Sequence, residues 1–307
     1  MRVVELPEIE SALDESAALA AVEDAFRRMS AGQAQVAAVG HLAFGDPPGD
    51  CHVKGGYLNG DDVFVFKIAT SFYRNPNIGL PSSNGMMIIV SARTGENLAL
   101  LNDRGYLTDL RTAMAGAIAA RAIARSDAAT LGIVGTGIQA RMQAEQVSRA
   151  LGIRTVVVWG RNPERRDALA SDIGGEAVDL PELCALADII VTATPSDRPL
   201  LSAEMVRPGT RIVAVGADSP GKQELETALV AKARIIVDSR PQCVAHGEAG
   251  WAVRAGLVRE DSLMELGALL ASPVWFGEDE IVIADLTGVA VQDVAIAKCV
   301  WTSLSGQ

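Results

Sequence analysis

The sequence predicts an α/β protein in which a doubly wound parallel sheet follows an N-terminal α+β part. Two observations support this fold class. Residues 37–101 contain short alternating or continuous apolar runs separated by Gly, Asn, Asp and Pro, as in a mostly antiparallel sheet. After residue 120, apolar runs of the kind found in buried strands recur at intervals of about 20–30 residues, with helical segments between them.

The elements of the N-terminal part follow from local patterns. Apolar residues at helical spacing predict a helix over 11–31, which Gly32 ends. Turn residues at 58–63 and 91–97 predict two hairpins within the sheet. An alanine-rich stretch predicts a long helix over 108–124.

The second part alternates strands and helices. Its predicted strands are TLGIVG, TVVVWG, ADIIVTAT, RIVAVGA and ARIIVDS. A helix over 288–301, apolar on most sides, is expected to cross back and cover the first domain. We therefore assign 1–118 and 289–307 to an α+β domain and 119–288 to the parallel-sheet domain.

Composition limits the classes of function. The 307 residues are 49% hydrophobic and 21% charged, an ordinary globular profile. A net charge of −11 argues against nucleic acid or an anionic membrane as a partner, so an anionic substrate needs a local cluster of cations. The four cysteines form no CxxC pair, which predicts buried reduced thiols and no metal site. With no signal-peptide pattern and no apolar run of about 20 residues, we expect a cytoplasmic protein.

The stretch GTGIQA follows a predicted strand and opens a predicted helix. Gly135 permits a tight turn, Gly137 lets the backbone approach a pyrophosphate, and Ala140 keeps helix and strand close. The helix would direct its N-terminal N–H groups at the phosphates. Although such turns also occur by chance, this context predicts a Rossmann dinucleotide site. Its first contacts would be Gly135, Thr136, Gly137, Ile138 and Gln139.

The end of the second strand indicates which dinucleotide binds. NAD enzymes usually carry Asp or Glu there, whereas this chain has WGRNPERR. Arg161 offers a charged fork that matches a 2′-phosphate, so NADP(H) is preferred over NAD(H) as the predicted cofactor. The alternative is that these arginines only solvate a helix start. The further predicted contacts are Gly160, Arg161, Asn162, Arg165, Thr194 and Val215.

A cluster of cations upstream could bind an anionic substrate. Lys54 and Lys67 are thirteen residues apart with a turn midway, so they can face one another across neighbouring strands. Arg111 and Thr112 fall in the first turn of the predicted helix, and an arginine among small residues is costly to bury unless it meets an anion. These cations predict a carboxylate site, although each alone could be a surface cation. Asp218 stands after a strand, where open α/β sheets bind ligands.

Several motifs resemble the ornithine cyclodeaminase/μ-crystallin family through nearly the whole chain. They are KIATSF…GLPSSNG, LTDLRTAMAGAIAA, GTGIQA, GADSPGKQEL and DLTGVAVQD. The family includes ornithine and lysine cyclodeaminases, archaeal-type alanine dehydrogenase and imino-acid reductases. The resemblance implies a homodimer formed through the N-terminal domain, and a substrate held between that domain and a nicotinamide.

The resemblance also implies roles for single residues. By position, Lys67 and Arg111 resemble the family's binders of the substrate α-carboxylate. Thr112 resembles a phosphate contact and Ser82 a polar substrate contact. Asp218 resembles the acid near the reacting nitrogen, so Asp218 and Lys67 are the candidates for moving a proton.

Lys54 departs from the pattern of ornithine cyclodeaminase itself, which has an acidic residue there. A lysine would repel a distal ammonium, and the KGG pattern instead resembles iminosuccinate reductases, whose substrate has a second carboxylate. SSNGMM and NDRGYLTDLRT are also similar to ectoine-utilisation cyclodeaminase-like proteins. The leading hypothesis is an NAD(P)H-dependent reductase of an α-imino acid, or the reverse amino-acid dehydrogenase. The alternatives are a redox-neutral cyclodeaminase with bound NAD and a μ-crystallin-like NADPH-binding protein.

Overall fold

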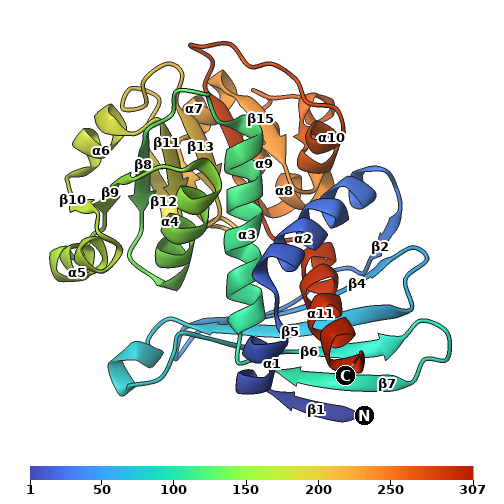
Figure 1. Ribbon diagram of the computed structural model, residues 1–307. Coiled ribbons are helices and arrows are strands. Elements are labelled where there is room, and N and C mark those ends of the chain that lie inside the picture. The colour runs from blue at the N-terminus through green and yellow to red at the C-terminus, as the bar shows by residue number, and fades with distance from the viewer. Residues whose placement is uncertain (307) are drawn as a thin grey trace. The chain divides into compact units, whose positions relative to one another are not determined.

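The computed structural model describes residues 1–306 and divides the chain into two compact units (Figure 1). The first unit comprises Met1–Arg111 and the segment from Val289 onward, and the second comprises Thr112–Gly288. The division falls within helix α3 (Tyr106–Ile123), as does the predicted boundary after residue 118. The predicted fold class is confirmed, because the second unit contains an all-parallel sheet and the first a mainly antiparallel one.

The first unit is built on a seven-stranded sheet in the order β1-β7-β6-β5-β4-β2, with β3 also paired to β4. Only the β1–β7 pair is parallel among its described pairings. The strands are β1 (Arg2–Glu5), β2 (Ala34–Val36), β3 (Gly40–Phe44), β4 (Gly49–Leu58), β5 (Val63–Phe72), β6 (Ser83–Ser91) and β7 (Asn97–Asn102). Both predicted hairpin turns are confirmed, since they join β4 to β5 and β6 to β7.

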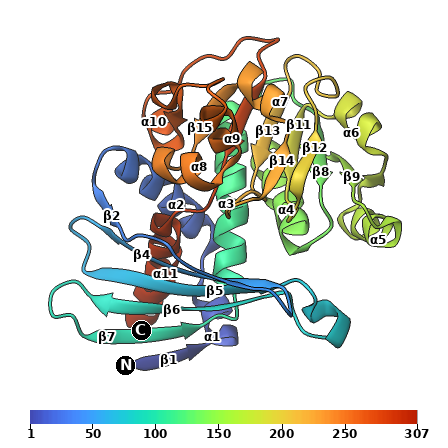
Figure 2. The same cartoon turned by 180° about the vertical axis from the view of Figure 1, so that it is seen from behind.

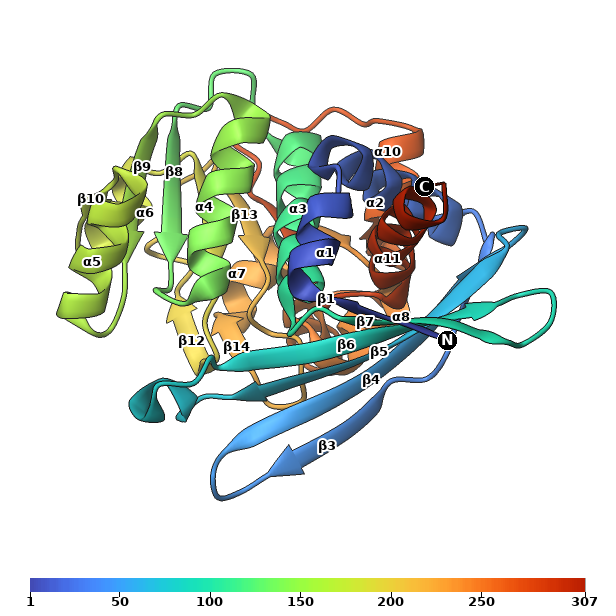
Figure 3. The same cartoon turned by 60° about the horizontal axis from the view of Figure 1, so that its bottom comes forward.

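Helices cover one face of this sheet (Figure 3). They are α1 (Leu6–Ala12), α2 (Glu15–Ser30) and α11 (Ala290–Ser305), and a short 3₁₀ helix, η1 (Asn75–Ile78), lies between β5 and β6. The prediction that the last helix returns to the first domain is confirmed by the packing of α11 on α2, β4 and β5. Gly56 permits this close approach, because a Cβ there would lie 3.2 Å from side-chain atoms of Ala290 and Val294.

The first predicted helix begins later than residue 11. Asp14 caps α2 by accepting from the backbone N–H groups of Ser16 and Ala17, at 2.8 and 3.1 Å. The residues before it form α1 as a separate short helix.

The second unit contains an eight-stranded parallel sheet in the order β10-β9-β8-β11-β13-β17-β15-β16. Its first five strands follow the 3-2-1-4-5 order of a Rossmann fold. The sheet strands are β8 (Thr130–Val134), β9 (Thr155–Trp159), β10 (Glu176–Ala177), β11 (Ile189–Thr192), β13 (Arg211–Ala214), β15 (Arg234–Val237), β16 (Met264–Glu265) and β17 (Val282–Asp285). All five predicted strands are confirmed.

A separate parallel pair and several helices complete this unit (Figure 2). The pair is β12 (Asp197–Leu201) with β14 (Gln223–Leu225). The remaining helices are α4 (Ile138–Leu151), α5 (Pro163–Ile173), α6 (Leu180–Leu186), α7 (Thr227–Lys232), α8 (Arg240–His246), α9 (Glu248–Arg254), η2 (Glu260–Ser262) and α10 (Leu266–Ala271). Within residues 1–306, no helix has both the length and the apolar character that a membrane span requires.

Candidate active site

Lys54 and Lys67 are directly paired across β4 and β5, as their spacing predicts. Alternation along the strands directs both toward the helix-covered face, where Lys54 is 6% and Lys67 1% exposed. Two buried ammonium groups on adjacent strands repel each other unless an anion lies nearby. An anionic group near the two lysines is therefore expected, because it would offset their repulsion.

Helix α11 supplies that charge from the far end of the chain. Asp293 Oδ1 lies 2.9 Å from Lys67 Nζ and 2.9 Å from Arg111 Nε. Arg111 Nη1 also donates to Gln292 Oε1. All of these residues belong to the first unit, so their arrangement is a property of that unit alone. The structure thus brings together Lys54, Lys67 and Arg111 in one cationic cluster.

The charges of this cluster are unbalanced. Burial, and after it the charges of Arg111 and Lys54, lower the pKa of Lys67 to about 7, although the nearby carboxylate of Asp293 opposes this shift. Burial would raise the pKa of Asp293, but Arg111, Lys67 and Lys54 together hold it below its ordinary value. Asp103, whose pKa burial raises, also faces Lys67. Three basic side chains around Asp293 are a favourable environment for a further carboxylate.

The prediction that Arg111 and Thr112 lie in the first turn of their helix is wrong. Helix α3 begins at Tyr106 and places them in its second turn. The earlier start depends on Asp103, whose carboxylate accepts from Leu107 N at 2.8 Å. Arg104 and Gly105, which lie between Asp103 and the first residue of α3, have positive φ angles of 56° and 90°, and an apolar pattern gives no sign of this compact turn.

Ser82 precedes β6, and its carbonyl accepts from Phe72 N at 2.7 Å. It therefore lies near the end of β5, whereas Lys67 is in the middle of that strand, opposite Met87. Of the proposed substrate contacts, Ser82 is the one placed outside the cationic cluster.

The glycine motif in the second unit has the geometry of a phosphate loop. Gly135 has a φ of 134°, and a Cβ there would lie 2.6 Å from the carbonyl oxygen of Ala193. At Gly137 a Cβ would meet nothing within 4 Å, so this side of the turn is open to a ligand. Gly137 also caps the fourteen-residue helix α4 without a side-chain acceptor, which leaves backbone donors for a phosphate. Thr136, Ile138 and Gln139 continue this partly exposed edge.

The loop after β9 begins helix α5 and is also the predicted contact for the ribose of the cofactor. Asn162 caps α5 by accepting from Arg165 N at 2.8 Å, and Gly160 is needed because a Cβ would lie 2.3 Å from Thr136 Cγ2. Arg161 and Arg165 are both exposed. The residues present fit a dinucleotide, with basic side chains at the position that contacts the ribose.

Glu224 organises the loops after β11 and β13. Its buried carboxylate accepts from Thr192 Oγ1, from both N and Oγ1 of Thr194, and from Gly216 N, at 2.7–2.9 Å. Val215 lies in the same loop region and is buried. Asp218 follows, with Lys222 Nζ at 2.6 Å and the Ser219 hydroxyl at 3.1 Å from its Oδ1. The predicted residues Thr194, Val215 and Asp218 thus lie on loops that one buried carboxylate holds.

Buried carboxylates make the stability of this unit sensitive to pH. Burial raises the pKa of Glu224 to about 7; burial and then Asp285 raise that of Glu248 to about 9. Because the folded form binds these protons more tightly than the unfolded form, the stabilisation is fully present below the ordinary pKa of 4.5, and it is lost progressively as pH rises from there through about 7 for Glu224 and about 9 for Glu248. We expect thermal unfolding to move to lower temperature between pH 6 and 9. Glu248→Gln should reduce the loss of unfolding free energy between pH 6 and 9 by at least about 1 kcal/mol. Glu204→Gln, at an exposed position, should leave this loss unchanged.

Sequence reasoning missed Gln292, Asp293 and Glu224. Each belongs to a quoted motif, DLTGVAVQD or GADSPGKQEL, and the polar pair in an otherwise apolar helix was the available signal for the first two. Among residues 1–306 no group of His, Cys, Asp or Glu has the arrangement of a metal site.

The ornithine cyclodeaminase/mu-crystallin family model matches residues 2–307. The chain belongs to this family. Alanine dehydrogenase of Archaeoglobus fulgidus is 38% identical over 301 residues, covering 96% of this chain and 92% of that protein. Iminosuccinate reductase of Paracoccus denitrificans is 36% identical over 306 residues, covering 98% and 95%.

Two solved structures have the same fold over the whole chain. An archaeal alanine dehydrogenase dimer with bound NAD has a TM-score of 0.92 and 34% identity, covering 100% of this chain and 96% of that one. The P. denitrificans iminosuccinate reductase in complex with NAD⁺ has a TM-score of 0.89 and 35% identity, covering 100% and 97%.

Proposed function

We propose that this family member is a nicotinamide-dependent reductase of an α-imino acid, or the reverse amino-acid dehydrogenase. The observation that carries the proposal is the cationic cluster, in which Lys67 and Arg111 share one oxygen of Asp293 beside Lys54. Such a cluster suits a substrate carboxylate, and the relatives named above are an alanine dehydrogenase and an iminosuccinate reductase. The glycine-rich turn of the second unit supplies the place for the cofactor.

The residues divide the work of the reaction. Lys67 and Arg111 bind the α-carboxylate and so fix the orientation of the C=N bond. When bound, the reduced nicotinamide supplies the hydride that the imine carbon accepts. The imine nitrogen needs one proton, which Asp218 or Lys67 supplies directly or through water.

Steady-state assays separate this function from the two alternatives. Purified protein is mixed with NADH or NADPH and a panel of keto acids with ammonia or methylamine. Steady cofactor oxidation supports a reductase. Ammonia release from diamino acids without net oxidation supports a cyclodeaminase, which Lys54 disfavours by repelling a distal ammonium. Tight cofactor binding with neither reaction supports a binding protein.

For the cofactor we propose a preference for NADP(H), supported by Arg161 after β9. Arg161→Asp is expected to weaken NADPH binding by about 1–3 kcal/mol, because a charge-assisted contact with the 2′-phosphate is lost. The affinities for NADPH and NADH can be compared by fluorescence titration, with exposed Arg154→Asp as the control. A wild-type protein that strongly prefers NADH contradicts the assignment.

We propose that Lys54 recognises a second, distal carboxylate. Asp61 and Asp62, its alternative partners across the hairpin, pair with Arg28 and Lys298 and with Arg93, respectively. Because Lys54 lies directly opposite Lys67, Lys54→Ala should lower kcat/KM by about 10- to 150-fold for dicarboxylic imino acids and leave monocarboxylic ones nearly unchanged. Equal losses on a mono- and a dicarboxylic substrate contradict this role.

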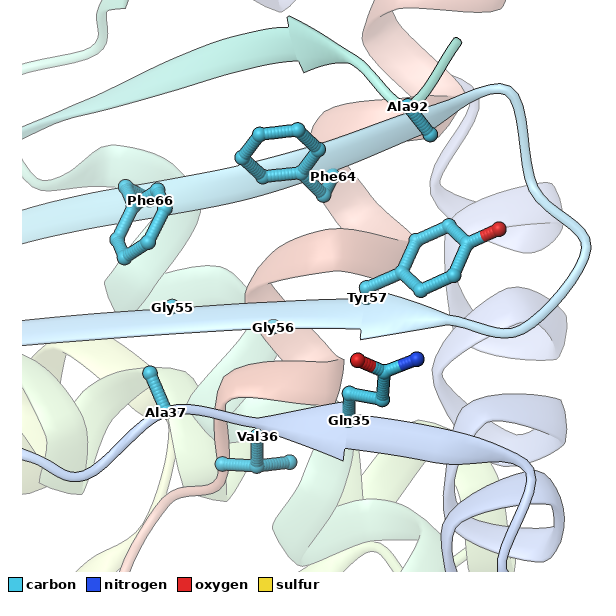
Figure 4. Close-up of a pocket in the computed structure, with 9 residues that line it drawn as sticks. All are labelled: Gln35, Val36, Ala37, Gly55, Gly56, Tyr57, Phe64, Phe66 and Ala92. Carbon is cyan, nitrogen blue, oxygen red and sulfur yellow. The ribbon is translucent and has the colours of Figure 1, made fainter. Parts of the chain in front are cut away.

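We also propose a homodimer in which a second copy covers the outer face of the first unit's sheet. Outward apolar side chains surround a shallow hollow of about 460 Å³, where Phe64, Phe66 and Tyr57 stand over the strands (Figure 4). Phe66 is 41% exposed, and its ring occupies the space over Gly55, where a Cβ would lie 2.2 Å away. Apolar patches of this kind are typical of interfaces. A monomeric mass by light scattering at micromolar concentration counts against the proposal.

A further inference from the structure

Two buried polar side chains interrupt an apolar helix. Helix α11 packs against the sheet through small and branched residues, as Ala290 and Val294 do against Gly56. Between them, Gln292 and Asp293 are 0% and 2% exposed. Burying a carboxylate is costly, and apolar residues would dock the helix at lower cost. Gln292 and Asp293 therefore have a role other than packing α11 against the sheet.

The contacts of the pair all lead to the substrate-binding cations. Asp293 Oδ1 accepts a hydrogen bond from Lys67 and forms an ion pair with Arg111, and Asp293 Oδ2 is buried without a hydrogen-bond partner among residues 1–306. Gln292 accepts from the Arg111 guanidinium through Oε1. The Lys67 ammonium and the Arg111 guanidinium are thus both held at the same oxygen atom, Asp293 Oδ1.

We propose that Asp293 is a positioning residue that holds Lys67 and Arg111 in register for the substrate carboxylate, with Gln292 fixing the rotation of the guanidinium. This inference rests on the proposed carboxylate-binding role of the two cations. In this proposal Asp293 does not contact the substrate, because Oδ1 already contacts Lys67 and Arg111 and Oδ2 is buried. Its negative charge also lets the two cations remain close together when no substrate is bound.

The same contacts give the proposal a signature in pH. Lys67 is faced by Lys54 on β4, Arg111 on α3, Asp293 on α11 and Asp103 before α3. Asp293 raises the pKa of Lys67 against burial and the two cations. Without that charge Lys67 loses its proton at lower pH, and carboxylate affinity is lost with it.

The test measures binding of oxamate, a non-reacting carboxylate, to the protein–NADPH complex from pH 5.5 to 9 by calorimetry. In the wild type we expect affinity to fall as pH rises through about 7. Asp293→Asn should weaken oxamate by at least about 30-fold at pH 7 and move the midpoint to lower pH. Asp293→Glu, which keeps the charge, should retain the wild-type midpoint. Gln292→Leu should weaken binding without moving the midpoint.

Asp61→Asn is the matched control, because Asp61 also anchors α11 through Lys298 at 2.7 Å and α2 through Arg28 at 3.2 Å. It should lower the melting temperature and leave oxamate binding unchanged. If Asp293→Asn changes only the melting temperature, the positioning role is wrong. If the wild type binds oxamate but reduces no imine, the proposed function fails while the oxamate titration still decides this inference. A wild type that reduces imines but does not bind oxamate contradicts this inference and leaves the proposed function standing.

Discussion

Replacing Arg111 with alanine is expected to lower kcat/KM for every imino acid by about 2–5 kcal/mol, or about 30- to 5,000-fold. The guanidinium is buried and held by Asp293 and Gln292, so no neighbouring side chain can reproduce its fork. All substrates share the α-carboxylate, and the loss should therefore not depend on the rest of the molecule. This uniform loss distinguishes Arg111 from Lys54.

Kinetics on a mono- and a dicarboxylic substrate measure this effect. Arg111→Lys should recover little, because an ammonium cannot make the bidentate contacts of a guanidinium. Arg121→Ala, at an exposed position on the same helix, is the control. If Arg111→Ala keeps kcat/KM within about threefold of wild type, the carboxylate binds elsewhere.

Local sequence patterns predicted correctly those features of the structure that depend on residues close together in the chain. The turn between Leu58 and Val63 fixes the register of β4 and β5, and that register alone places Lys54 opposite Lys67. Likewise, a strand, a glycine turn and a helix follow one another without interruption around Gly137. Both features could be predicted because few residues separate their parts.

Contacts between distant segments could not be predicted in the same way. Asp293 is 226 positions from Lys67, and only the packing of α11 on the sheet brings them together. Helix periodicity identifies the apolar face of α11 but does not say which buried side chain meets which cation. The start of α3 was missed for a related reason, since it depends on the cap supplied by Asp103 and on two residues with positive φ.

Asp218→Asn is expected to lower kcat by about 10²- to 10⁴-fold, the usual range for loss of a proton-transferring group. We propose that Asp218 exchanges the proton of the substrate nitrogen. Lys222 Nζ, at 2.6 Å, and the Ser219 hydroxyl, at 3.1 Å, hold its Oδ1. Asp218 follows β13, at the carboxyl end of the parallel sheet, where open α/β sheets bind ligands. Asparagine keeps the shape and these contacts but cannot give or take the proton.

The readout that identifies a chemical role is kcat at saturating substrate, together with the NADPH affinity. Because Asp218→Asn removes only the proton transfer, NADPH affinity and oxamate affinity should remain near wild type while kcat falls. Asp261→Asn is the matched control: this surface carboxylate of the same unit also pairs with a nearby cation, Arg259, at 2.5 Å, and its loss should not change kcat. A variant in which oxamate affinity falls as much as kcat would instead make Asp218 a substrate-binding residue, and the proton would then have to come from Lys67 or from water.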